Sequence, residues 1–177
     1  MFKSDIKDKS GGIIIADSNI IILGKSNIIK REDTYESFGG RVEKDDISSL
    51  HTALREFVEE FFNDKLSLEH LNMLAIKVRM NNIILKQCYY FGMTYMINFN
   101  GLNQLCIYLC EYIDSIKKYN KDNVFDLNMY IMERVVLEQP KDGMNEIKSL
   151  HIFTLDDIKN NRIKLRWFTN KIINKLL

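Results

Sequence analysis

Short apolar runs around a cluster of turn-forming residues mark the start of the chain. Residues 11–26, GGIIIADSNIIILGKS, place two such runs on either side of Asp17-Ser18-Asn19. β-Branched runs that flank Asp, Ser and Asn in this way are typical of a β-hairpin. We therefore expect the first unit of the chain to be a β-hairpin.

A second pair of apolar segments follows further along the chain. Residues 71–80, LNMLAIKVRM, and residues 83–97, IILKQCYYFGMTYMI, lie on either side of Asn81-Asn82. Both are rich in the β-branched and aromatic residues that favour strands. This composition predicts two long strands that turn at Asn81-Asn82.

Between these two pairs, apolar residues recur at intervals of three and four. The positions are Leu50, Leu54, Phe57, Val58 and Phe61. Such a stripe predicts an amphipathic helix, from about Ser48 to Asn63, that docks on a sheet. Asp45, Asp46 and Ser48 are the candidates to cap its N-terminus, where a side-chain acceptor satisfies free N–H groups.

After Gly101 the apolar pattern becomes helical again. The stripe consists of Leu102, Leu105, Cys106, Leu109, Ile113 and Ile116. Residues 123–140, NVFDLNMYIMERVVLEQP, suit a helix with Val124, Leu127, Ile131 and Val135 on one face, although MYIMERVVL alone has the composition of a strand. We favour the helix, which Pro140 and the following Asp142-Gly143 would end.

The tail is expected to hold three further elements. Residues 148–155, KSLHIFTL, read as a strand, Asp156-Asp157 as a turn, and the chain from about Thr169 onward as a helix. No internal repeat or linker divides the sequence. The pattern as a whole therefore predicts an α/β fold in one domain.

Composition narrows the class of protein. The chain has 177 residues, of which 46% are hydrophobic and 28% charged, as expected for one globular domain. The formal net charge of +1 argues against a protein whose whole surface attracts nucleic acid. Cys88, Cys106 and Cys110 lack CxxC spacing, so we expect reduced, buried thiols and neither a disulfide framework nor a zinc site. The polar start, MFKSDIKDKSGG, and the lack of a membrane-spanning apolar run predict a cytoplasmic protein without a membrane partner.

The helix from Ser48 to Asn63 also carries a cluster of acids. Glu56, Glu59 and Glu60 lie within one helical turn, where like charges four apart cost only about 0.2–0.5 kcal/mol per pair. That cost alone does not distinguish a solvated face from a site. The preceding Gly-Gly turn and the neighbouring Arg55 favour a site, because Mg²⁺ prefers one or two carboxylates together with waters and phosphates. Arg55 is expected to fork onto a carboxylate, such as Asp46 or Glu56.

Residues 39–60, GGRVEKDDISSLHTALREFVEE, resemble the Nudix box, whose pattern is G-x5-E-x7-R-E-U-x-E-E-x-G-U with U apolar. Residues 55–60, REFVEE, match its catalytic half without a gap. The strands before the box and the final strand and helix also look like those of the family. The resemblance implies a Nudix α/β/α sandwich with a mixed sheet over residues 1–177, with a helical insert at about 101–140.

Two positions depart from the Nudix pattern. One extra residue lies between Gly40 and Arg55, and Asp46 stands where the first Glu of the box is expected. The loop therefore needs a bulge, and the pairing of Asp46 with Arg55 is left open. Phe62 replaces the last Gly of the box, which should lengthen the helix. Gly40, Glu43 and Asp46 are the residues to which the resemblance gives a structural role in the motif.

The resemblance also implies a metal-dependent site. It assigns Mg²⁺ or Mn²⁺ to Glu56, Glu59 and Glu60 together with the carbonyl of Gly39, and it assigns catalysis to these glutamates and Arg55. Which glutamate serves as general base is left open. Glu146 lies where several members place an acid that binds metal or reads the substrate; the alternative is an ordinary loop acid.

The activity implied by the resemblance is Mg²⁺-dependent pyrophosphohydrolysis of a nucleoside diphosphate linked to another group. One alternative is removal of mRNA caps, as in some Nudix proteins of large DNA viruses, which would place the protein in host cytoplasm. Another is a Nudix-like module that binds nucleotides without hydrolysis. The insert suits substrate choice, a homodimer contact or cover for a sheet edge.

Aromatic and basic residues near the C-terminus leave two readings open. Trp167 and Phe168 lie within a basic tail that could hold an RNA backbone and stack a base. The favoured alternative is a basic helix whose aromatic residues face the core. Tyr89-Tyr90-Phe91 could likewise line a base pocket, although strand alternation turns Tyr90 away from its neighbours, and core packing is favoured there too.

Overall fold

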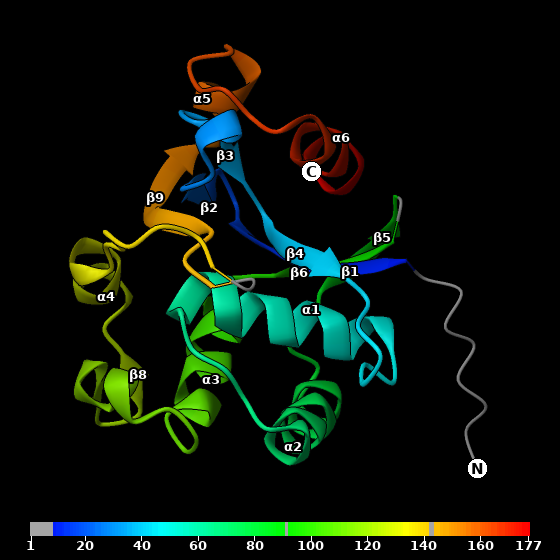
Figure 1. The fold of residues 1–177 in the computed structure, drawn as a ribbon, viewed down its shortest axis with the longest axis vertical. Coiled ribbons are helices and arrows are strands. Elements are labelled where there is room, and N and C mark those ends of the chain that lie inside the picture. Colours follow the sequence, from blue (N-terminus) through cyan, green and yellow to red (C-terminus); the bar gives the residue numbers. More distant parts are fainter. Residues whose placement is uncertain (1–8, 91, 142–143) are drawn as a thin grey trace.

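A mixed sheet lies at the centre of the molecule, with helices on both of its faces (Figure 1). The computed structural model of the protein describes residues 9–90, 92–141 and 144–177. The first part of the polar start, Phe91 and Asp142-Gly143 lie outside these described residues. The expected α/β fold with a mixed sheet is confirmed.

The expected N-terminal hairpin forms the middle of the sheet. β1 (Ser10–Asp17) pairs antiparallel with β2 (Ile20–Ser26) around Ser18, whose φ of 51° suits a tight turn. β6 (Met93–Ile97) runs parallel to β1, and β5 (Lys86–Tyr89) pairs antiparallel with β6. β1 therefore has parallel and antiparallel neighbours, which makes the sheet mixed.

Three further strands complete the sheet around the hairpin. β4 (Phe38–Arg41) pairs with β1, whereas β3 (Tyr35–Glu36) and β9 (Ile147–Thr154) pair with β2. All three pairings are antiparallel. The last strand of the fold is thus brought beside the first hairpin, which places the segment before β9 close to β4.

Alternate side chains of β1 and β2 build two hydrophobic cores. Ile13, Ile15 and Ile22 face the helices that follow β4, and Ile14 and Ile21 belong to a second cluster with the C-terminal helices. This is the period-two alternation expected of strands that are covered on both faces.

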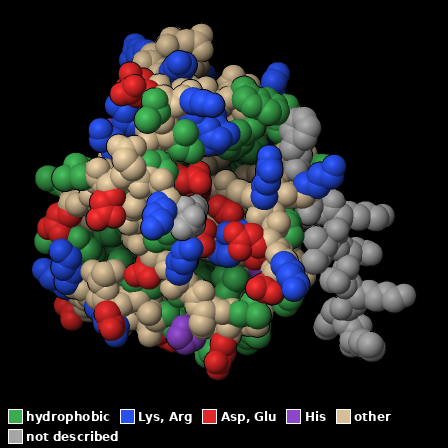
Figure 2. All heavy atoms as spheres, viewed as in Figure 1, with side chains coloured by type: hydrophobic (Ala, Val, Ile, Leu, Met, Phe, Trp, Pro, Cys, Tyr) green, Lys and Arg blue, Asp and Glu red, His purple; other side chains and the backbone are tan. Residues whose placement is uncertain are grey.

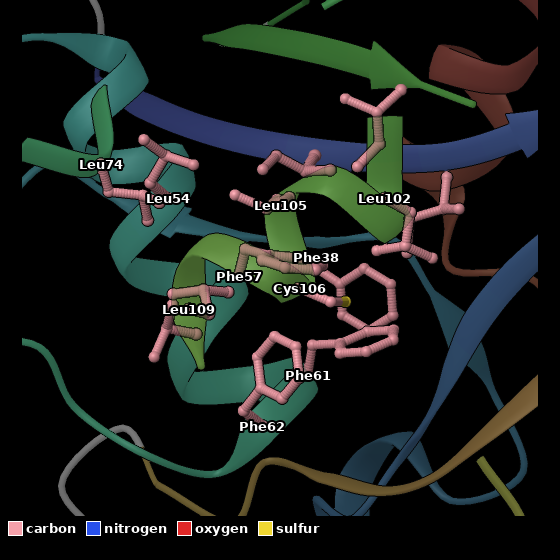
Figure 3. Close-up of a cluster of buried hydrophobic side chains, with 14 of the residues drawn as sticks. Phe38, Leu54, Phe57, Phe61, Phe62, Leu74, Leu102, Leu105, Cys106 and Leu109 are labelled. Atoms are coloured by element: carbon pink, nitrogen blue, oxygen red, sulfur yellow. The ribbon is translucent and has the colours of Figure 1, made fainter. Parts of the chain in front are cut away.

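The acidic helix forms as the apolar stripe predicts. α1 (Ser49–Phe57) begins after Ser48, whose side chain accepts a hydrogen bond from the His51 amide at 3.3 Å. It continues as a π-helical turn (Val58–Phe62) and ends at Asn63, which has a left-handed φ of 54°. The apolar residues of the stripe point into the core shown in Figure 3.

The segment 71–80 is a helix, so its predicted strand is wrong. α2 (Leu68–Met80) begins at Ser67, whose hydroxyl accepts from the His70 amide at 3.1 Å. Its buried residues are Leu71, Leu74, Ala75 and Val78. They recur at intervals of three and four, the period of a helix, and this spacing outweighs the β-branched composition. Asn81 and Asn82 end this helix and do not connect two strands.

The single long strand predicted over residues 83–97 is wrong as well, because β5 and β6 form a hairpin within it. Asp156 and Asp157 belong to a short helix, α5 (Leu155–Lys159), and not to a turn; Thr154 and Asp157 form a capping box that starts it. The predicted C-terminal helix is confirmed as α6 (Trp167–Leu176), which begins two residues earlier than expected.

Residues 101–140 contain two helices with irregular structure between them. α3 (Phe99–Leu109) is followed by a 3₁₀ segment (Asp114–Tyr119). The short strands β7 (Asn120–Lys121) and β8 (Val124–Phe125) then lead to α4 (Leu127–Glu133). The predicted helix over 123–140 is therefore confirmed only in its middle.

Val135, expected on the stripe of that helix, lies beyond its end. It forms a bridge with Ser149, and the amide of Val136 donates to the carbonyl of Lys148 at 2.8 Å. The chain after α4 thus covers part of the outer edge of β9.

Two further features concern the cysteine thiols and the possibility of a membrane-spanning helix. Cys106 and Cys110 are buried free thiols, and Cys88 is a half-buried one. No helix within the described ranges is both long enough and apolar enough to cross a membrane.

A pair of substitutions on α2 distinguishes the helix from a strand. Leu74 is fully buried, whereas Ile76, which would share its face in a strand, is 57% exposed. Leu74→Ala should lower the free energy of unfolding by about 2–5 kcal/mol, and Ile76→Ala should change it by no more than about 0.5 kcal/mol. Urea unfolding of both variants measures this, and equal losses would contradict the helix.

Candidate active site

A cavity of about 700 Å³ opens between the β1–β4 edge, the π-helical turn, the start of β9 and the start of α6. Its acidic lining consists of Glu43, Glu56, Glu59, Glu60 and Glu146. Its basic and aromatic lining consists of Lys9, Arg31, Arg41, Arg166, Tyr90, Trp167 and Phe168. On the face shown in Figure 2, acidic side chains gather near the centre, with Lys and Arg side chains around them.

The glycine pair Gly39-Gly40, which precedes the acidic helix, lies close to the Glu56 side chain and to the backbone of β1. A Cβ atom at Gly40 would collide with the Glu56 carboxylate, and a Cβ atom at Gly39 would lie 2.6 Å from the Cα of Gly12. Gly39 therefore needs glycine because its neighbour is backbone, whereas a side chain at Gly40 would displace the Glu56 carboxylate. The pair brings β4 against β1 on one side and against the glutamates on the other.

Arg55 holds Asp46 in a two-pronged ion pair. Its Nε donates to Oδ1 of Asp46 at 3.2 Å, and its Nη2 donates to Oδ2 at 3.0 Å. The same carboxylate accepts from the Glu43 amide and from the Thr52 hydroxyl, each at 2.9 Å. The pairing that the sequence left open is thus present, because the loop with its extra residue folds around the Asp46 carboxylate.

The remaining contacts of Arg55 reach the glutamates. Its Nη1 lies 2.9 Å from a Glu56 oxygen, 3.2 Å from a Glu59 oxygen and 3.3 Å from a Glu43 oxygen. Glu60 turns away from Arg55 and accepts a hydrogen bond from the Gly39 amide at 2.6 Å. One guanidinium therefore faces several carboxylates, as a fork-shaped cation can.

Burial perturbs the acids of the cavity. It raises the pKa of Glu56 to about 7, with Glu59 and Glu146 adding to the rise and Arg55 opposing it. It also raises the pKa of Glu59, raises that of Glu60 well above the usual range, and raises that of Glu146. Burial would raise the pKa of Asp46 too, but its hydrogen bond from Arg55 leaves that pKa lowered.

These acids have the chemistry of a divalent metal site but do not converge on one point. Within the described residues, no three Asp, Glu, His or Cys side chains stand together as a metal centre. Glu56 and Glu59 point to Arg55, and Glu60 points to the Gly39 amide. Buried carboxylates whose pKa is raised are stabilised by a nearby cation, and hard divalent ions take carboxylate oxygens. The donor set therefore fits Mg²⁺ or Mn²⁺ once side chains rotate toward the cavity.

The structure places every site residue expected from the sequence at or beside this cavity. Gly39, Gly40, Glu43 and the three helical glutamates line it, and so does Glu146, which comes from the segment before β9. Arg55 and Asp46 lie next to it through their ion pairs. Glu146 is thus brought to the other acids, although more than eighty positions separate it from Glu60.

Sequence reasoning missed the positive charges of the cavity. Arg31 and Arg166 line it; Arg166 forms an ion pair with buried Glu36, and its guanidinium carbon lies 4.4 Å from the centroid of the Phe168 ring. No motif marks Arg31, which reaches the cavity from a short 3₁₀ helix (Ile29–Arg31). Arg166 was visible only as part of the basic tail.

The sequence left open whether Tyr90, Trp167 and Phe168 stack on a base or pack in the core, and the structure gives different answers for them. Phe168 and Tyr90 pack against the second core and also line the cavity. Trp167 lines the cavity and is 60% exposed, and its ring meets that of Tyr90 edge-on at 6.0 Å. Core packing alone therefore accounts for Phe168 better than for Trp167.

Comparison with known proteins gives a likeness of fold. A scan of family models finds no match, and a search of curated proteins finds none. Among solved structures, the chain is similar to a bifunctional NMN adenylyltransferase/ADP-ribose pyrophosphatase from Francisella tularensis, crystallised with AMP and a Mn ion. The TM-score is 0.51 at 15% sequence identity, over 94% of this chain and 40% of that one. This likeness concerns the fold alone and agrees with the expected α/β sandwich with a mixed sheet.

The raised pKa values predict how stability depends on pH in the metal-free protein. The pKa of Glu56 is about 7 in the folded protein and near 4.5 in the unfolded chain. Ionisation of Glu56 therefore destabilises the fold, and this destabilisation is complete above about pH 7. This destabilisation is relieved as pH falls through 7 and is absent below the unfolded value.

Urea unfolding at about pH 8 and about pH 6 measures this effect by comparing the wild type with Glu56→Gln. The gain in stability on acidification should be smaller in Glu56→Gln, since the amide does not titrate. His51 and His151, whose pKa values burial lowers, act equally in both proteins. An equal gain in both would contradict the perturbed carboxylate.

Proposed function

We propose that the protein is a Mg²⁺- or Mn²⁺-dependent hydrolase of Nudix type that cleaves nucleoside diphosphates linked to another group. The observation that carries the proposal is the gathering of buried glutamates with raised pKa values around one cavity, next to glycines that leave room for them. A surface that served only for solubility would keep its carboxylates hydrated and at ordinary pKa values.

Glu56, Glu59 and Glu60, with the Gly39 carbonyl and Glu146 nearby, are the residues that would hold the ions. Divalent ions held there would offset the negative charge of a diphosphate and would help to activate water as the nucleophile. In the metal-free protein Arg55 pairs with Glu56 and Glu59 at 2.9 and 3.2 Å, and these carboxylates would turn from it toward the cavity to reach an ion. Asp46 in turn holds Arg55, so that the guanidinium does not fold onto the glutamates alone.

The aromatic and basic lining of the cavity suits a nucleotide. Tyr90, Trp167 and Phe168 offer ring faces and edges there, and stacking of a base on such side chains contributes about 1–3 kcal/mol per base. Arg31 and Arg166 provide positive charge for phosphate oxygens. A substrate with a base, phosphates and a second group thus finds aromatic, basic and acidic surfaces within one cavity.

A substrate panel tests the proposed activity directly. The purified protein is incubated with Mg²⁺ and nucleotide sugars, oxidised nucleoside triphosphates or capped RNA, and products are separated by chromatography. We expect cleavage of a small diphosphate-containing nucleotide. Cleavage of capped RNA alone would identify a decapping enzyme, and binding without any cleavage would identify a silent module.

Glu59→Gln shows whether the cleavage comes from this cavity. The amide keeps the shape of the side chain but loses the negative charge, so the unfolding temperature should stay near that of the wild type. We expect kcat to fall by about a hundredfold or more, as when a group that stabilises the transition state is lost. Glu69→Gln, an exposed acid on α2, is the matched control, and undiminished activity of Glu59→Gln would refute the site.

Trp167→Ala tests the aromatic end of the cavity. Loss of one stacking partner should raise KM for a nucleotide substrate by about tenfold, with little change in kcat because the Trp167 ring would supply no ligand to the ions. Trp167→Phe should retain most of the affinity. Steady-state kinetics measure both variants, and an unchanged KM in Trp167→Ala would exclude Trp167 from substrate binding.

A further inference from the structure

The π-helical turn that carries Glu59 and Glu60 ends in buried carbonyl groups. The last carbonyls of a helix accept no hydrogen bond from the amides of that helix. Where they are buried, they need a hydrogen-bond donor from another segment of the chain. Here the donors are the side chains of Tyr130 in α4 and of Arg134 just after it, and α4 lies beside the end of this helix (Figure 1). Segments about 70 residues apart in the chain thus meet at the turn.

Arg134, just after α4, provides most of these contacts. Its Nη2 donates to the carbonyl of Glu60 at 2.6 Å, and its Nε donates to the carbonyl of Phe61 at 3.1 Å. The hydroxyl of Tyr130 donates to the same Phe61 carbonyl at 2.7 Å. The positive charge therefore lies at the C-terminal end of the helix, where the helix dipole favours a cation.

The third guanidinium nitrogen of Arg134 contacts the backbone at the start of β9. Its Nη1 donates to the carbonyl of Ile147 at 2.6 Å, directly after Glu146 in the chain. One guanidinium thus joins the main chain that carries Glu60 to the main chain that carries Glu146. Arg134 is only 7% exposed, so these contacts take place away from bulk water, where charged hydrogen bonds orient their partners most strongly.

We propose that Arg134 is a positioning residue for the carboxylate site, fixing the backbone at Glu60 and Glu146 so that both acids face one cavity. The inference rests on the proposed function, since it assigns Arg134 a part in preparing that site. Arg134 is not among the residues that line the cavity. It gives residues 101–140 a role that the sequence left open, because α4 brings both Tyr130 and Arg134 to the turn.

The exchange rate of the Gly39 amide reports whether Arg134 positions the turn, without any activity assay. The amide of Gly39 donates to Oε2 of Glu60 at 2.6 Å, and this hydrogen bond protects the amide from exchange with solvent. If Arg134 holds the turn in place, Arg134→Met should speed the exchange of the Gly39 amide. The amide of Ile173, in α6 on the opposite side of the sheet, reports general loosening, which would speed both.

Hydrogen exchange by NMR and Mn²⁺ binding by electron paramagnetic resonance test the proposal on the full chain. Arg134→Met should speed exchange at Gly39 and not at Ile173, and should weaken Mn²⁺ binding by about 10- to 100-fold. Arg134→Lys, which keeps the charge but not the fork, should fall between. Arg79→Met, at an exposed position on α2, is the matched control and should change neither readout.

An unchanged Gly39 exchange rate in folded Arg134→Met would overturn the proposal, whatever happens to Mn²⁺ binding. Should this variant fail to fold, Arg134→Lys keeps the charge and removes the fork that joins the Glu60, Phe61 and Ile147 carbonyls; an unchanged Gly39 rate in it would overturn the proposal equally. A wild type that binds no Mn²⁺, with Gly39 exchange still dependent on Arg134, would refute the proposed function and leave the positioning role intact.

Discussion

Carboxylates taken out of water must be matched by positive charge or take up protons. In this protein Arg55 supplies part of that charge, since it contacts Asp46 and three glutamates at distances of 2.9 to 3.3 Å. The match is incomplete, because the pKa values of Glu56, Glu59 and Glu60 remain raised. Because positive charge is short in this cavity, a divalent cation bound there would stabilise the ionised carboxylates.

The rest of the fold serves to keep those carboxylates in place despite their repulsion. Phenylalanines of α1 and the π-helical turn anchor the opposite face of the helix: the rings of Phe57 and Phe61 stack at 4.8 Å, and both meet Phe38 edge-on (Figure 3). Their burial provides more stabilisation than the like charges remove. The glycines of β4 then bring a strand close enough for Glu56 and Glu60 to meet it.

The acidic helix and its neighbours could be predicted because their signals are local. The stripe from Leu50 to Phe61 has one period throughout, and the Gly-Gly pair and REFVEE lie within a short stretch. α2 was missed because Ile76 and Val78 favour strands by composition while the buried positions follow a helical period. Two local signals disagreed there, and packing against α1 decided between them.

The distant members of the site could not be read from the chain in the same way. Arg31, Tyr90 and Arg166 reach the cavity from a short 3₁₀ helix, the end of β5 and the residue before α6. Pairings between distant segments, such as β2 with β9 and β1 with β6, bring those parts together. Arg134 gave no signal at all, because a single buried arginine looks like any other charge in a helical stretch.

Binding of divalent cations in this cavity is the property on which the proposed function depends. The most direct test is anomalous diffraction from crystals soaked in Mn²⁺, which locates the ion independently of any substrate. We expect a manganese peak within the cavity, bound by Glu56 and its helical neighbours, with these carboxylates rotated away from Arg55. Crystals with no manganese peak in the cavity, and with the carboxylates still paired to Arg55, would contradict the account.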